Sequence, residues 1–232
     1  IKCVVQTKRN ARTTKGIIPG LVFEKQENEQ KIKQQLKSMS AREKILNAIA
    51  SNQPELTALP LMDKNVLIRY EDVYAQFKTV LESIGGKVKL IPSLTELKEQ
   101  LIADKASGNF VVNAIADLGK LDNQVASFTA LDLEKVEKAY IKGTAGVAEN
   151  GAVWIYESQM LNRLLPFICQ HLIIVIDKAA IVATMHQAYE NIDVAKEGFG
   201  AFIAGPSKTA DIEQSLVIGA HGARSATIYV VG

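Results

Sequence analysis

The chain has little cysteine, little histidine and almost no net charge. Its 232 residues include two cysteines, Cys3 and Cys169, and three histidines. Neither residue type recurs at a spacing typical of a zinc or iron–sulfur site. The formal net charge of +2 gives no reason to expect nucleic-acid binding. We therefore expect this chain to bind no metal and no redox cofactor of its own.

Long apolar runs and nucleotide fingerprints are also missing. No stretch approaches the roughly 20 apolar residues that a membrane span needs, and no secretion signal is recognisable. Free cysteines without such a signal are typical of the cytoplasm, so we expect a cytoplasmic protein that makes no membrane contact. Without a Gly-x-Gly-x-x-Gly motif, a Walker A loop or a nucleophile elbow, classical dinucleotide, nucleotide and serine-hydrolase functions lack support.

Residues 1–38 differ in composition from the rest. Five basic residues precede the first acid, Glu24, and a Gln/Glu/Lys stretch follows it. We predict that 1–38 is an N-terminal extension and that 39–232 forms the folded domain. A basic arm can bind nucleic acid, but a solvated tail is the interpretation that we favour.

The first half of the domain alternates helical and strand patterns. Helices are predicted over 40–50, 72–84 and, from the capping-box pattern Ser93-x-x-Glu96, over 93–106. Strands are predicted over 65–70, 87–91 and 110–115. This alternation predicts an α/β fold with a mainly parallel sheet and helices on both faces.

The second half holds shorter strand patterns. Asn150-Gly151 between apolar pieces predicts a hairpin. A continuous apolar run predicts a buried strand over 172–176, and the remaining patterns predict strands over 139–141, 146–148, 152–156, 201–204 and 226–231, and helices over 183–190 and 207–218.

The turn before the last predicted helix is the first candidate site. Gly205-Pro206 forms the turn, and Ser207 or Thr209 is placed to cap the helix. Free N–H groups at a helix start can bind an anion, and Lys208 adds positive charge. The predicted anion-binding residues are Gly205, Pro206, Ser207, Lys208, Thr209 and Asp211. The alternative is a well-capped structural turn in which Asp211 only complements the helix dipole.

A second polar group follows that predicted helix. His221 can shuttle protons, and Arg224 can hold a carboxylate or phosphate with two hydrogen bonds. Gly222 lies between them. The alternative is that Gly222 ends the helix and His221 offsets its C-terminal dipole. Both interpretations stay open.

These blocks resemble the LUD-domain family, in particular its lactate utilization protein C branch. The run from Gly205 to Glu213 matches the family's block in full, and His221-Gly222-Ala223-Arg224 matches the next with Ala223 in place of proline. Ala148-Glu149-Asn150-Gly151 is similar to a third segment, with Asn150 in place of threonine. The resemblance runs from about Met39 to Gly232.

The resemblance implies a role in oxidising L-lactate to pyruvate. Such a chain would be the cofactor-poor component, acting on a small anionic metabolite beside partner proteins that carry iron–sulfur clusters. A homo-oligomer stays open, as does a pure interaction protein. The fold group that the family resembles includes ribose-5-phosphate isomerase and coenzyme A transferases, and some of the latter use the glutamate of a Glu-Asn-Gly motif as nucleophile. This makes Glu149 the candidate catalytic residue of an alternative, stand-alone enzyme acting on a phosphorylated or acyl-CoA metabolite, although an ordinary hairpin turn explains the motif as well.

Overall fold

The computed structural model describes residues 39–58, 60, 63, 66–212 and 215–232. Its internal contacts divide the chain into two units, residues 1–62 and 63–232. The expectations for residues 1–38 lie outside the described residues, and the boundary that we placed at residue 39 stays a prediction.

The described part of the first unit contains one helix, α2 (Ala41–Ser51). The Ser40 hydroxyl accepts from the Glu43 N–H, and the Glu43 carboxylate accepts from the Ser40 N–H at 2.7 Å. This reciprocal capping box explains why the helix begins where the sequence pattern predicts it.

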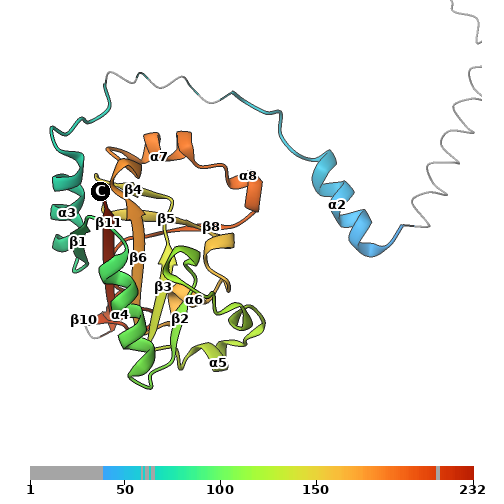
Figure 1. Cartoon of the computed structure of the whole chain (residues 1–232). Coiled ribbons are helices and arrows are strands. Elements are labelled where there is room, and N and C mark those ends of the chain that lie inside the picture. The colour runs from blue at the N-terminus through green and yellow to red at the C-terminus, as the bar shows by residue number, and fades with distance from the viewer. Residues whose placement is uncertain (1–38, 59, 61–62, 64–65, 213–214) are drawn as a thin grey trace, which may run out of the picture. The chain divides into compact units, whose positions relative to one another are not determined.

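The second unit is built on a five-stranded sheet in which every neighbouring pair is parallel. Long apolar stretches form its middle strands, as expected for a parallel sheet that is buried on both faces. The order across the sheet is β1 (Lys87–Ile91), β11 (Ser225–Val231), β6 (His171–Asp177), β3 (Lys138–Lys142) and β2 (Val111–Asn113). The last strand of the chain therefore lies inside the sheet (Figure 1).

A second, four-stranded sheet has mixed direction. β4 pairs with β5 in antiparallel fashion through the hairpin that Asn150-Gly151 predicts, and the Asn150 side chain accepts from the Ala152 N–H at 3.0 Å. Its order is β7 (Ile181–Val182), β4 (Ala145–Val147), β5 (Ala152–Tyr156) and β8 (Gly200–Ile203).

Helices cover both faces of the parallel sheet, which confirms the predicted fold class. Helix α4 (Thr95–Ala106) packs Leu97 and Leu101 against one face. On the other face, α3 (Val73–Ser83), α6 (Leu165–Ile168) and the second sheet share one large core. Figure 1 shows α3 and α4 beside the sheet. The other short helical segments are η2 (Ala116–Leu118), η3 (Asn123–Ser127), α5 (Ala130–Leu133), η4 (Glu157–Gln159), η5 (Lys178–Ala180), α7 (Met185–Asn191) and α8 (Val194–Glu197).

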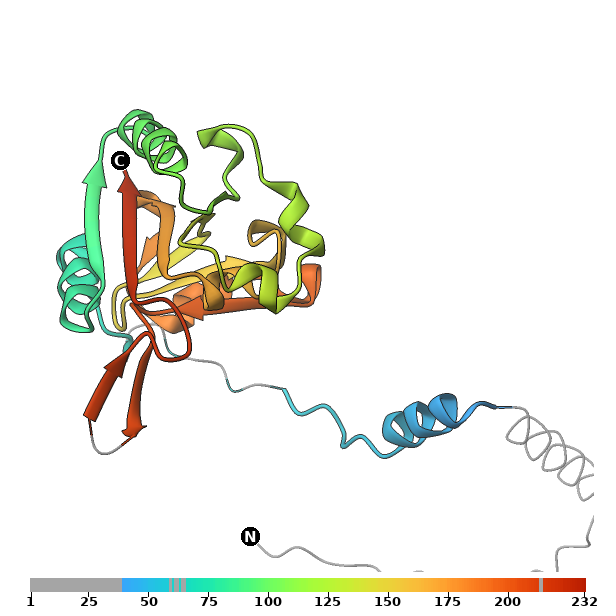
Figure 2. The ribbon, with the colours of Figure 1, turned by 90° about the horizontal axis from the view of Figure 1, so that it is seen from below.

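The helix predicted over 207–218 is wrong. The segment forms an antiparallel pair of strands, β9 (Lys208–Ile212) and β10 (Ser215–Ile218). Thr209, Val217 and Ile218 are β-branched, and such residues favour strands over helices. Figure 2 shows this hairpin extending away from the layered body.

Two smaller predictions are also wrong. Residues 66–70 form no strand, so α3 precedes β1 without the strand expected before it. The Ser93 capping box does not form, because the Ser93 hydroxyl accepts from the Thr95 N–H two residues on, at 3.4 Å, and α4 begins at Thr95. Such short-range bonds compete with helix capping.

Candidate functional site

The C-terminal residues singled out in the sequence form a compact arrangement of turns, which we call the C-terminal turn cluster (Gly205–Ser207 and Gly219–Arg224). The Ser207 N–H donates to the Ala223 carbonyl at 2.9 Å, and the Gly219 N–H donates to the Ser207 carbonyl at 3.0 Å. The Arg224 N–H donates to the Gln170 carbonyl at 2.8 Å. These backbone donors are thus used within the fold.

Glycine is required at two positions of this cluster. Gly219 has φ +79°, and a Cβ there would lie 2.4 Å from Arg224 Cγ. A Cβ on Gly222 would lie 2.9 Å from Ser207 Cβ. The structure therefore brings Ser207, Gly222 and Arg224 together through close backbone packing.

The remaining residues of the predicted anion site lie on the hairpin or beside it. Because β9 replaces the predicted helix, the helix N-terminus on which that site depended does not exist. Pro206 is buried, and Lys208 belongs to β9, with its side chain close to Gly85 at the end of α3. Thr209 and Asp211 are also in β9, and His221 is exposed.

Glu149 lies at a different place, beside the start of α7. Its carboxylate Oε2 accepts from the Met185 N–H at 3.0 Å, and its own N–H donates to the Ala183 carbonyl at 3.0 Å. A carboxylate at a helix start stabilises the helix without binding a ligand. None of these bonds connects Glu149 with the C-terminal turn cluster.

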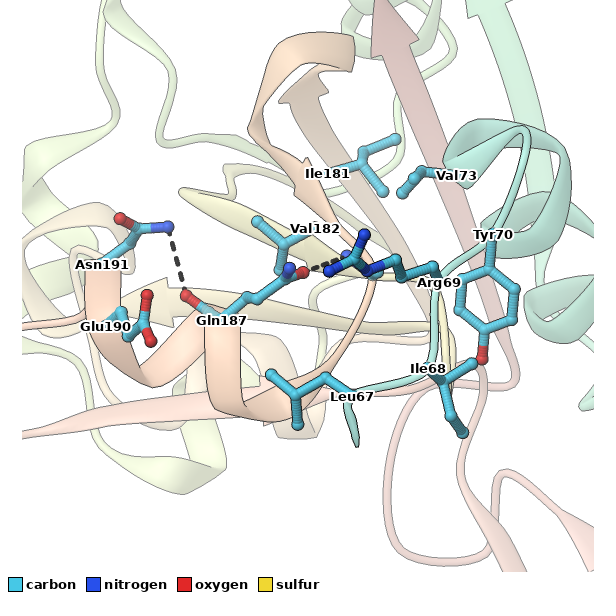
Figure 3. A pocket seen from close by; sticks show the side chains of 11 residues that line it. Leu67, Ile68, Arg69, Tyr70, Val73, Ile181, Val182, Gln187, Glu190 and Asn191 are labelled. Carbon is cyan, nitrogen blue, oxygen red and sulfur yellow. Dashed lines mark hydrogen bonds between the residues drawn. The ribbon is translucent and has the colours of Figure 1, made fainter. Parts of the chain in front are cut away.

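A pocket of about 670 Å³, which we call the Arg69 pocket, opens beside α7 and the start of α3. Figure 3 shows the Arg69 guanidinium pointing toward Gln187, with Val73 and Ile181 above it. No carboxylate among the described residues pairs with Arg69. The lining of the Arg69 pocket comprises Leu67, Ile68, Arg69, Tyr70, Val73, Ile181, Val182, Ala183, Gln187, Glu190 and Asn191.

One wall of the pocket is held rigidly by the capping of α7. The Thr184 hydroxyl accepts from the Gln187 N–H at 3.4 Å, and Gln187 Oε1 accepts from the Ala183 N–H at 2.9 Å. Gln187 Oε1 also accepts from the Thr184 N–H at 3.4 Å. These bonds use the amide oxygen of Gln187 and leave its NH₂ group on the pocket side as a donor.

The pocket thus combines a guanidinium, the amides of Gln187 and Asn191, the Glu190 carboxylate and an apolar wall. A guanidinium forms two parallel hydrogen bonds with a carboxylate, and apolar walls with a few placed polar groups are typical of small-molecule sites. None of the residues predicted from the sequence lines it. Thr184-x-x-Gln187 has the spacing of a capping box, so this wall of the pocket could have been found from the sequence. Arg69 lies in an apolar stretch that contains no recognisable motif.

Other features limit the chemistry. Burial raises the pKa of the Cys169 thiol to about 12, so this cysteine stays protonated at neutral pH and is a poor nucleophile. The described residues contain no group of three or more His, Cys, Asp or Glu side chains arranged to hold a metal. Within the same residues, every helix is too short or too polar to cross a bilayer.

Comparison with known proteins connects residues 134–231 with one family. This segment matches the model of the LUD domain. The chain is 39% identical over 90 residues to "Lactate utilization protein C" of Shouchella clausii, covering 37% of this chain and 39% of that protein. It is 38% identical over 82 residues to the protein of the same name from Bacillus pumilus, covering 33% and 34%. The aligned segments thus span well under half of these relatives.

Two further matches extend over more of the chain. An uncharacterized protein of Neisseria meningitidis is 27% identical over 158 residues, covering 67% of this chain and 65% of that one. The crystal structure of a DUF162 family protein from Deinococcus radiodurans superposes with a TM-score of 0.51 at 20% identity, over 69% of this chain and 96% of that chain. That likeness supports the α/β fold and carries no functional argument. Residues 134–231 therefore match the LUD domain, and this part of the chain is similar to proteins named lactate utilization protein C.

Proposed function

We propose that this chain serves lactate utilization and that the Arg69 pocket holds the small carboxylate substrate. Two observations support the proposal. The first is the name shared by the relatives of the LUD segment. The second is that Arg69, which has no carboxylate partner among the described residues, points into a pocket (Figure 3). The second observation carries the assignment of the site.

The pocket has a group for each part of lactate. The Arg69 guanidinium suits the carboxylate, the Gln187 amide suits the hydroxyl, and the side chains of Val73 and Val182 suit the methyl group. The volume of about 670 Å³ leaves room for more than lactate alone.

Oxidation of lactate to pyruvate removes two electrons and needs an acceptor. The two cysteines of this chain are too few for a four-cysteine iron–sulfur cluster. In this proposal the chain is therefore the cofactor-poor component, and partner proteins with iron–sulfur clusters receive the electrons.

The alternative, a stand-alone enzyme with Glu149 as nucleophile, has less geometric support. The Glu149 carboxylate is hydrogen-bonded to the start of α7, and that bond lowers its availability for attack on an acyl or phosphoryl group.

The test is lactate-dependent dye reduction by the complex co-purified with its native partners. Arg69→Gln should raise the apparent KM for lactate about tenfold to a hundredfold, the loss expected for a charge-assisted pair. The apparent KM of Arg69→Lys should lie between those of wild type and Arg69→Gln, because lysine keeps the charge without the paired geometry. Arg163→Gln is the matched control, since Arg163 is exposed and pairs with Glu157 outside the pocket.

An unchanged KM in both Arg69 variants would rule out the Arg69 pocket as the lactate site. Failure to find any lactate-dependent reduction, together with acylation of Glu149 by an acyl-CoA, would support the stand-alone enzyme instead.

A further inference from the structure

A second hollow, of about 390 Å³, lies where several strands of the parallel sheet begin. We call it the lysine hollow. Its lining comes from four strands and from α4: Lys87 and Lys89 of β1, Ser225, Thr227 and Tyr229 of β11, His171 and Ile173 of β6, Lys138 of β3, and Gln100.

Strand register explains why these side chains meet. Lys87 pairs with Thr227, Ser225 pairs with His171, and His171 pairs with Lys138 across neighbouring strands. Since alternate residues of a strand point to the same face, Lys87 and Lys89 share one face, as do Ser225, Thr227 and Tyr229. The hollow is therefore one continuous patch of the sheet.

This patch is unusual for a parallel sheet. Both faces of such sheets are normally covered and apolar. On this face the later residues are apolar and buried, for example Ile91 and Val175, and Leu97 and Leu101 of α4 pack on them. The first residues are instead lysine, serine, threonine and histidine, and they line an open hollow. Packing of the core does not require this change in chemistry.

Lys87 and Lys89 differ in their ion pairing from the other basic residues of the hollow, Lys138 and His171. Lys138 pairs with Asp104 at 2.6 Å, and His171 Nε2 lies 3.4 Å from Glu137 Oε1. Neither Lys87 nor Lys89 has a carboxylate partner among the described residues. Lysines on an edge strand such as β1 also prevent sheets from pairing edge to edge, but that role does not require them to line a hollow.

A short chain of hydrogen bonds orients one of these lysines. Lys89 Nζ donates to the Tyr229 hydroxyl at 3.1 Å, and that hydroxyl donates to Gln100 Oε1 at 2.6 Å. The remaining N–H groups of Lys89 are left as donors, whereas the Gln100 side chain also forms a hydrogen bond with Tyr140. Together with the Thr227 hydroxyl and Lys87, the Lys89 N–H groups supply a group of donors with no carboxylate in the lining.

We propose that the lysine hollow binds a small molecule through a phosphate group. Lysine ammonium groups act as point charges that suit phosphate oxygens, and the lining holds no arginine that would match a planar carboxylate with paired bonds. A volume of about 390 Å³ accepts a phosphate with a small organic part. This site is separate from the Arg69 pocket and does not depend on the lactate proposal.

The direct test is calorimetric titration of the full chain with inorganic phosphate and with pyrophosphate at low ionic strength. The double variant Lys87→Gln/Lys89→Gln should bind pyrophosphate at least about tenfold more weakly. Lys98→Gln is the matched control, because Lys98 is an exposed lysine of α4 outside the hollow. The affinity of this variant for pyrophosphate should stay within about twofold of wild type. Thr227→Val should cause a smaller, few-fold loss.

A second measurement uses the wild-type chain and so does not depend on variants that fold. Acylation of lysines, read by mass spectrometry, should slow at Lys87 and Lys89 when pyrophosphate is present and stay unchanged at Lys98.

Several results would overturn the proposal. These are absence of phosphate and pyrophosphate binding to wild type, equal losses in the double variant and in Lys98→Gln, or no protection of Lys87 and Lys89. Binding of acetate as tight as that of pyrophosphate would refute the phosphate class. Binding of a single-stranded oligonucleotide without any binding of the two small anions would point to a different partner and would equally refute the proposal.

Discussion

The C-terminal turn cluster and the lysine hollow are both rich in polar groups, but they use them in opposite ways. In the cluster, the N–H groups of Ser207, Gly219 and Arg224 all donate to backbone carbonyls. In the hollow, the donors of Lys87 and Lys89 are side-chain groups, and most of them are not used by the fold.

The comparison shows which kind of polarity points to a ligand. A turn needs polar and glycine residues for its own geometry, because its backbone groups need partners and its dihedral angles need freedom. The face of a parallel sheet has no such need, since its backbone groups are already paired in the ladder. Polar side chains on that face therefore require another explanation.

The largest expected effect concerns the glycines of the cluster. Gly219→Ala should lower the free energy of unfolding by about 2–4 kcal/mol, from a positive φ of +79° and from the close approach of Arg224. Chemical denaturation measures the change. Gly108→Ala is the control, because Gly108 has φ +82° with nothing within 4 Å of its Cβ position, and it should lose only about 1–2 kcal/mol.

Equal losses in the two variants would mean that close packing contributes nothing in the cluster. The claim that the residues of the C-terminal turn cluster serve its own packing, unlike those of the lysine hollow, would then be wrong. A ligand role for the cluster would regain support.

Much of the fold follows from local patterns. The strand predicted over 87–91 has the observed bounds of β1, and the hairpin at Asn150-Gly151 forms as expected. These succeed because strand periodicity and turn chemistry are local properties. The helix prediction for 207–218 is wrong because it also used only a local pattern, and that pattern was ambiguous. Ile212, Leu216 and Ile218 suggested a helical face, while the β-branched residues and the pairing of Thr209 with Val217 favour strands.

The two pockets were beyond the reach of such patterns. Lys87 and Lys89 lie in a correctly predicted strand, but their meaning depends on β11 lying next to β1, 140 residues away in sequence for Lys89 and Tyr229. Arg69 becomes notable only because α7 lies opposite it. Strand order and helix placement determine which side chains meet in the two pockets, and neither can be predicted from a local stretch of residues.

A smaller effect is expected at Glu149. Glu149→Ala should lower the free energy of unfolding by about 0.5–2 kcal/mol, because it removes the acceptor of the Met185 N–H at the start of α7. Glu149→Gln keeps an acceptor and should lose less, about 0.3–1 kcal/mol from the lost charge at the helix start. Thermal or chemical unfolding separates the two. If both variants are as stable as wild type yet abolish activity in the lactate assay, Glu149 is catalytic and its bond to α7 is incidental.

The smallest expected effect, and the sharpest test of the comparison, is that of Arg224→Ala. Arg224 is exposed and immediately precedes Ser225, which lines the lysine hollow. Since successive residues along a strand point to opposite faces, and the Arg224 N–H already continues the ladder by donating to Gln170, its side chain is expected to point away from the hollow. Pyrophosphate affinity should then stay within about twofold of wild type, and the free energy of unfolding should change by about 0.5 kcal/mol or less. Titrating Arg224→Ala and Lys87→Gln/Lys89→Gln with pyrophosphate under the same conditions compares the two regions directly. A loss at Arg224 as large as in the lysine variant would show that the anion site reaches into the C-terminal turn cluster, as the sequence motif first suggested, and that the two regions act as one.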